Sequence, residues 1–105
     1  MIVEEQARTE RIQQVSVAWL PPPSGWVVLN SDGATRTNDK TAGCGGVLRD
    51  DRGMWLVGFA KALGDTTAYM AELWGIYEGL KLAKHRGTTR IEVRTDSQVI
   101  AQSLK

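Results

Sequence analysis

The chain has 105 residues, of which 42% are apolar, so it suits a single small domain with a modest core. Its net charge of +1 is too small for nucleic-acid binding by bulk electrostatics. A single cysteine (Cys44) and a single histidine (His85) exclude an internal disulfide and a zinc site of the usual ligand count. No apolar run approaches the roughly 20 residues of a membrane helix and no hydrophobic leader is present, so we expect an intracellular protein, nuclear or cytoplasmic, that is neither secreted nor bound to a membrane.

The first 24 residues differ in composition from the remainder. Residues 1–15 alternate charges with few large apolar groups, which indicates a frayed helix or a linker. Pro21–Pro23 then favours an extended, polyproline-like approach that offers a sheet no backbone donors. We therefore predict a linker or frayed helix over 1–24 and a folded domain over 25–105, with the boundary near Gly25.

Three strands are predicted next, joined as an antiparallel meander. They cover Trp26–Asp32, Ala42–Arg49 and Met54–Leu63, with a loop or hairpin end over 33–41. The middle strand contains three glycines, which weaken a strand unless another backbone or a ligand comes close.

A helix is predicted from Thr67 to Gly87, with Thr66 or Thr67 as its N-cap and Gly87 just past its end. Two glycines on its apolar side make sense if the helix backbone approaches a sheet closely. The apolar stripe at helical spacing consists of Tyr69, Leu73, Ile76, Leu80 and Ala83.

Glu72 belongs with this stripe, because its neighbours three to eight positions on are Gly75, Ile76, Gly79 and Leu80. A carboxylate is rarely buried unless it is paired or bound to a metal. The alternative is that Glu72 lies at the edge of the stripe and complements the helix dipole. The helix alone favours neither interpretation.

A fourth strand, Arg90–Thr95, precedes Asp96 and Ser97, and a second helix is predicted from Gln98. Strand, helix and strand form a crossover, so this strand should run parallel to the first. Asp32 and Asp96 then lie near the carboxyl ends of parallel strands, where ligands collect, and Glu72 faces them from the helix. Convergent carboxylates repel unless a cation lies among them, and Mg²⁺ suits ligands that are all oxygen.

The ordered motifs resemble the ribonuclease H superfamily, and most closely the ribonuclease H-like domain of plant non-LTR retrotransposons. Coverage runs from about Val17 to the last residue. The resemblance implies an α/β fold with a mixed sheet: a three-strand meander, a helix, a parallel fourth strand and the start of a second helix. The matching segments are Trp19–Trp26, Ser31–Ala34, Ala42–Asp50, Ala71–Trp74 and Thr95–Ser97.

The resemblance also implies a function. Asp32, Glu72 and Asp96 would be the catalytic carboxylates that bind Mg²⁺ or Mn²⁺, with two ions expected. The family hydrolyses the RNA strand of RNA–DNA hybrids and distinguishes the strands through 2′-hydroxyl contacts. Substrate contacts are expected at Gly33, Ala34 and Ser97, where Gly33 would let the RNA backbone come close. The partner is thus an RNA–DNA hybrid or another nucleic acid, and we expect a monomer, as a domain of a larger polyprotein or on its own.

Two departures from the family leave alternatives open. Thr66–Met70 lacks the polar amide side chains that cellular ribonucleases H place before the helix glutamate. The family continues with a fifth strand and a final helix that brings a fourth carboxylate, whereas this chain stops at Lys105. We therefore expect an unpaired edge on Arg90–Thr95 and poor hybrid cleavage. The alternatives are an inactive binding module and a retrotransposon-derived remnant in which Glu72 is buried and paired with Arg94.

Five cations gather late in the sequence and also permit two interpretations. Either the first three complement the negative end of the helix dipole and stay solvated, or the cations form a patch that follows phosphates. These residues are Lys81, Lys84, Arg86, Arg90 and Arg94.

Overall fold

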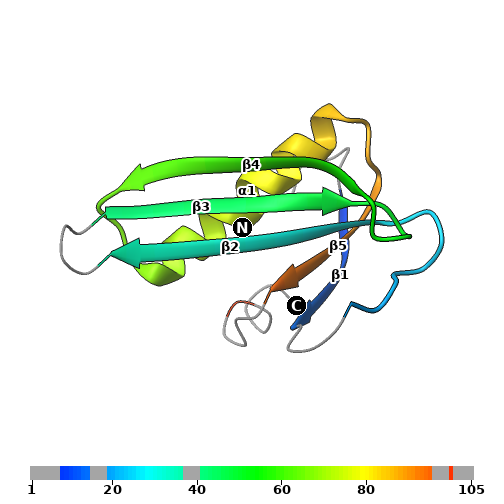
Figure 1. The fold of residues 1–105 in the computed structure, drawn as a ribbon, viewed down its shortest axis with the longest axis horizontal. Helices are drawn as coiled ribbons and strands as arrows, with labels where there is room; N and C mark the ends of the chain where they lie inside the picture. The colour runs from blue at the N-terminus through cyan, green and yellow to red at the C-terminus, as the bar shows by residue number, and fades with distance from the viewer. Residues whose placement is uncertain (1–7, 15–18, 37–40, 96–99, 101–105) are drawn as a thin grey trace.

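A five-stranded mixed sheet lies against one long helix in the computed structural model, which describes residues 8–14, 19–36, 41–95 and 100 (Figure 1). The strands follow the order β1-β5-β2-β3-β4 across the sheet. The elements are β1 (Arg8–Gln14), β2 (Val27–Arg36), β3 (Thr41–Arg49), β4 (Trp55–Gly64), α1 (Ala68–His85) and β5 (Arg90–Thr95).

The predicted meander and crossover are confirmed. β2 pairs antiparallel with β3 in the register Leu29↔Leu48, and β3 pairs antiparallel with β4. β5 returns beside β2 and runs parallel to it, from Val27↔Ile91 to Asn30↔Arg94. β2 extends beyond the predicted end at Asp32, because β3 continues to pair with it as far as Arg36↔Thr41.

The glycines of β3 have the close neighbours that the sequence requires. A Cβ at Gly46 would lie 2.8 Å from the Phe59 ring and 2.9 Å from the Asn30 carbonyl oxygen. A Cβ at Gly45 would lie 3.0 Å from the Phe59 carbonyl oxygen. The strand therefore keeps its glycines because neighbouring groups fill the space that side chains would need.

Both ends of α1 are capped as predicted. The Thr67 hydroxyl accepts a hydrogen bond from the Met70 N–H at 3.1 Å, so Thr67 rather than Thr66 is the N-cap. Past the other end, Gly87 has φ +78°, which a residue without a Cβ adopts readily. Among the described residues, no helix combines the length and the apolar character that crossing a membrane requires.

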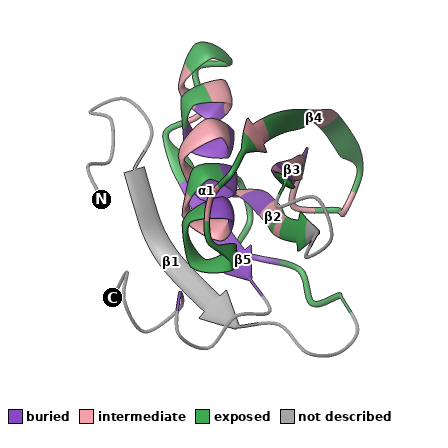
Figure 2. Ribbon diagram, turned by 90° about the vertical axis from the view of Figure 1, so that its left-hand side faces the viewer, coloured by how far each residue is buried: buried purple, intermediate pink, exposed green. Residues whose placement is uncertain are grey.

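The core lies between α1 and the sheet, where Figure 2 shows buried residues on the side of α1 that faces the strands. Ile76, Leu80 and Ala83 are buried there, as predicted, but Tyr69 is 42% exposed. The predicted burial of Tyr69 is wrong, because the first buried residue of α1 is Ala71. Ile100 is helical and fully buried in the same core, and the rest of the predicted second helix lies outside the described residues.

The prediction for the start of the chain is wrong for Arg8–Gln14. These residues form β1, a strand rather than a linker or frayed helix, and β1 pairs parallel with β5 from Arg8↔Arg90 to Gln14↔Thr95 (Figure 1). The edge of β5 that was expected to be unpaired is therefore covered. An edge strand carries a row of unsatisfied backbone groups, which gives the physical reason for recruiting a further strand.

Candidate active site

The backbones of β2 and α1 touch where Asp32 and Glu72 lie. A Cβ at Gly33 would lie 2.5 Å from the Glu72 nitrogen and 2.6 Å from the Ala71 carbonyl carbon, which leaves no room for a side chain. One turn further along α1, a Cβ at Gly75 would lie 3.3 Å from the Asp32 carbonyl oxygen. We call this contact the β2–α1 junction. It brings together two of the three predicted carboxylate positions, which are 40 residues apart in sequence.

The two carboxylates of the junction differ in exposure. Asp32 is exposed, and Glu72 is half-buried. Glu72 is therefore neither a fully buried core carboxylate nor a group in bulk solvent. A half-buried carboxylate and an exposed one on two backbones in close contact suit a site that admits both a cation and water.

The third predicted carboxylate, Asp96, and Ser97 lie outside the described residues, which end on β5 at Thr95. Among the residues that the structure does describe, no three His, Cys, Asp or Glu side chains form a group that could hold a metal ion. Ala34 is exposed on β2. The triad and the substrate contacts at Gly33, Ala34 and Ser97 remain predictions. For Gly33, the structure adds that the backbone in close approach is that of α1.

A buried ion pair that the sequence interpretation missed lies on β5. Arg94 Nε donates to Glu92 Oε2, and the side chains are 3% and 0% exposed. Arg94 therefore pairs with Glu92 and not with Glu72, as the remnant alternative supposed. Opposite charges two residues apart in an apolar strand lie on the same face, so Arg90–Thr95 carried a signal for this pair.

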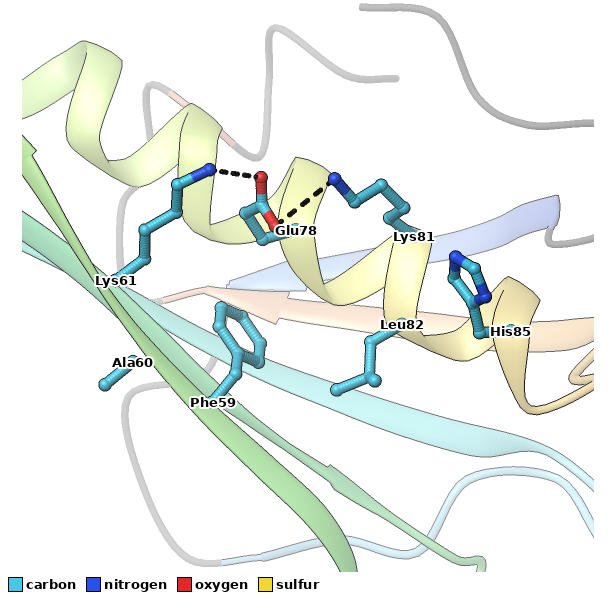
Figure 3. A pocket seen from close by; sticks show the side chains of 7 residues that line it. All are labelled: Phe59, Ala60, Lys61, Glu78, Lys81, Leu82 and His85. Carbon is cyan, nitrogen blue, oxygen red and sulfur yellow. Dashed lines mark hydrogen bonds and ion pairs between the residues drawn. The ribbon is translucent and has the colours of Figure 1, made fainter.

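A second cluster of charges lines a pocket of about 240 Å³ between β4 and the C-terminal half of α1 (Figure 3). Glu78 accepts a hydrogen bond from Lys61 Nζ at 2.9 Å and lies 3.7 Å from Lys81 Nζ. The hydrogen bond from Lys61 lowers the pKa of Glu78 below its ordinary value. The lysines also lie over the rings of Trp74 and Tyr77, at 5.4 and 5.5 Å.

The five cations do not act as one patch. Lys81 is ion-paired with Glu78, and Arg94 is buried with Glu92. Of the five, only Arg86 and Arg90 are exposed and have no ion pair among the described residues. This arrangement argues against a continuous patch that follows phosphates, and it departs from the solvated alternative for Lys81, which pairs with Glu78.

Cys44 is buried beneath α1, where a Cβ at Gly75 would lie 3.5 Å from its own Cβ. Burial raises the pKa of its thiol, so the thiolate is disfavoured at neutral pH. Cys44 thus packs the core and is poorly suited to act as a nucleophile.

The sheet order, the crossover and the junction define a ribonuclease H-like domain. Residues 30–105 match the family model described as reverse transcriptase-like, and the chain belongs to this family.

The similar proteins agree with this assignment. The chain is 45% identical to a "putative ribonuclease H protein" of Arabidopsis thaliana over 100 residues, which cover 95% of this chain and 16% of that protein. Ribonuclease H1 from Halobacterium salinarum superposes with a TM-score of 0.71 at 32% identity, covering 75% of this chain and 60% of that one. The structure of LC11 ribonuclease H1 in complex with an RNA/DNA hybrid superposes with a TM-score of 0.69 at 28% identity, covering 74% of this chain and 59% of that one. The chain thus spans less than two thirds of the length of each.

Proposed function

We propose that this chain carries the site of a metal-dependent ribonuclease H-type endonuclease that hydrolyses the RNA strand of RNA–DNA hybrids. The observation that supports this most directly is the β2–α1 junction, where the backbone of Glu72 lies against Gly33, the residue that follows Asp32. Similarity to a ribonuclease H1 structure in complex with an RNA/DNA hybrid supports the substrate class.

The strand register supports a place for the third carboxylate. β2 and β5 pair in parallel up to Asn30↔Arg94. Two residues further along each strand are Asp32 and Asp96, so the same register continued by one pleat would place Asp96 beside Asp32. Both acids would then lie where the β5 ladder ends and Glu72 approaches from α1.

The donor set fits Mg²⁺ or Mn²⁺. All three side chains offer only oxygen, and the exposure of Asp32 leaves room for the waters that Mg²⁺ usually retains. When bound, such ions activate a water molecule and stabilise charge on the attacking and leaving oxygens of a phosphodiester. Asp32, Glu72 and Asp96 would hold the ions and orient that water. Cys44 is too buried to serve as a nucleophile.

Beyond the reaction, we propose that the chain is a monomeric domain of a longer, intracellular polyprotein of the plant non-LTR retrotransposon type. Its 45% identity to the Arabidopsis thaliana relative, of which it covers 16%, supports the part of this proposal that concerns a longer plant protein.

The test measures Mn²⁺ binding and Mg²⁺-dependent cleavage of a labelled RNA–DNA hybrid by the wild type, Asp32→Asn, Glu72→Gln and the matched control Asp65→Asn. Asp65 is an exposed carboxylate outside the proposed site. We expect each site variant to lose about 10²–10³-fold in cleavage rate and to bind Mn²⁺ weakly, with Asp65→Asn unchanged. Metal binding without cleavage of the hybrid would support the inactive binding module instead, and wild type without metal binding would refute the proposal.

A further inference from the structure

The segment Trp19–Trp26 contacts the face of the sheet that α1 does not cover. Ile91 and Val93 of β5 belong to the core under α1. Side chains alternate along a strand, so Glu92 and Arg94 point to the opposite face. There the Trp19 ring lies 4.6 Å from the Arg94 guanidinium carbon, which is the geometry of a cation–π contact.

Arg94 is held from two sides. Glu92 accepts from its Nε, and the Trp19 ring lies against the guanidinium plane, so Arg94 is only 3% exposed. Buried ion pairs are often no more stabilising than apolar residues of similar volume, because desolvating both ions costs about as much as the pairing returns. Stability alone is therefore a weak explanation for this arrangement.

Trp19 is itself anchored to the rest of the sheet. A Cβ at Gly53, in the turn between β3 and β4, would lie 3.4 Å from the Trp19 ring. Gly25 N–H donates to Asp51 Oδ2 in the same turn at 2.7 Å, and the buried Trp26 leads directly into β2. The segment thus links the β3–β4 turn, the start of β2 and the side chain of Arg94.

Arg94 also shares a face of the sheet with Asp32. Leu29 lies under α1 against Gly79, so Asn30 and Asp32 point to the other face, the face of Arg94. Asn30 lies opposite Arg94 in the parallel ladder. Asp32 is two residues beyond Asn30, so one pleat of β2 separates Asp32 from the residue that pairs with Arg94.

We propose that Arg94 is a positioning residue: held by Glu92 and Trp19, it fixes the end of β5 against β2 beside Asn30 and thereby the placement of Asp32, two residues further along β2. Trp19–Trp26 then belongs to the support of the metal site, although it precedes the first carboxylate in the chain. This inference rests on the proposed function. Groups that orient metal ligands from outside the coordination sphere commonly change metal affinity by about 10- to 100-fold when they are removed.

The test separates positioning from stability by replacing both charges at once. Removing Arg94 alone would take an ion-pair partner from a buried Glu92. Glu92→Met with Arg94→Met instead replaces the pair by apolar side chains and should leave the melting temperature unchanged or higher. We expect this double variant to bind Mn²⁺ about 10- to 100-fold more weakly, measured by calorimetry well below its melting temperature. Trp19→Leu, which leaves β5 intact, should weaken Mn²⁺ binding several-fold. Trp19→Phe, which keeps an aromatic ring, should retain most of the wild-type Mn²⁺ affinity.

Lys61→Met is the matched control, because it breaks an ion pair on the other face of the sheet and should leave Mn²⁺ affinity unchanged. Wild-type affinity in the folded double variant, with binding abolished by Asp32→Asn, would overturn the role of Arg94 and leave the proposed function standing. No Mn²⁺ binding by the wild type would overturn both.

Discussion

The two halves of α1 meet the sheet in different ways. In the N-terminal half, Gly33 of β2 abuts the backbone of Ala71 and Glu72, and Gly75 packs near the Asp32 carbonyl. In the C-terminal half, Gly79 packs against the side chain of Leu29. That half also carries the ion pair of Glu78 and Lys81, whose side chains are 14% and 46% exposed (Figure 3).

This difference bears on how precisely each half is placed. A backbone contact has no rotamers through which to yield, whereas a leucine side chain or an exposed ion pair can adjust. The half of α1 with the rigid contact is the half that carries Glu72. The proposed site therefore lies where the fold permits least adjustment, which suits chemistry that loses about 10²-fold for a misplacement of about 1 Å.

The largest expected effect comes from Gly33→Ala. Its Cβ would lie 2.5–2.8 Å from backbone atoms of Ala71 and Glu72, so α1 must move away from β2. We expect a loss of about 3 kcal/mol in the free energy of unfolding, the upper end of typical overpacking, together with loss of Mn²⁺ binding. Urea denaturation and calorimetry measure the two effects.

Gly75→Ala and Gly79→Ala complete this comparison. At Gly75 the nearest atom would be 3.3 Å away, and a gain of about 1 kcal/mol in helix propensity should offset the crowding. At Gly79 the new Cβ meets the Leu29 side chain at 2.5 Å, so about 1–2 kcal/mol should be lost as Leu29 repacks. Equal stabilities of all three alanine variants would contradict a rigid junction.

The next effect concerns the cap of the first turn. Thr67→Ala removes the hydrogen bond to Met70 N–H and should cost about 1 kcal/mol. The frayed turn lies next to Glu72, so Mn²⁺ affinity should also fall. Thr66→Ala, which does not carry the cap, is the control, and an equal loss in both variants would argue against a specific effect of the cap.

Most of the fold could be predicted because its signals are local. Period-two and helical patterns located β2 to β5 and α1, and the glycines of β3 and α1 signalled close approach. β1 was missed because a parallel edge strand depends on its neighbour, and its own charged residues carry little strand signal. Tyr69 was misplaced because helical periodicity does not show where a helix first touches the sheet.

The site was predictable to a lesser depth. Motif order selected Asp32 and Glu72, and the structure places their backbones together. The sequence indicated that Gly33 accommodates the close approach of a substrate backbone, which stays a prediction. It did not indicate that the backbone of α1 also lies against Gly33. The spacing of Glu92 and Arg94 carried a signal for their pair, but the contact of Arg94 with Trp19 depends on a tertiary arrangement that no local pattern specifies.

The smallest effect should come from Lys61→Met in the C-terminal half of α1. The pKa of Glu78 is lowered chiefly by the hydrogen bond from Lys61, so this pair stabilises the fold above the ordinary value near 4.5 and loses its contribution as the pH falls through the lowered folded value. At pH 7 the variant should lose about 0.2–1 kcal/mol, as exposed ion pairs do, and added salt should shrink the difference. In strong acid, where Glu78 is protonated in both proteins, the difference should disappear.

Lys81 also pairs with Glu78, but its Nζ lies 3.7 Å away, so Lys81→Met should show the same pH dependence with a smaller loss of stability. A difference that persists in acid would show that Lys61 stabilises the protein through its contact with Trp74 rather than through the ion pair with Glu78. A change in Mn²⁺ affinity would show that the two halves of α1 are coupled.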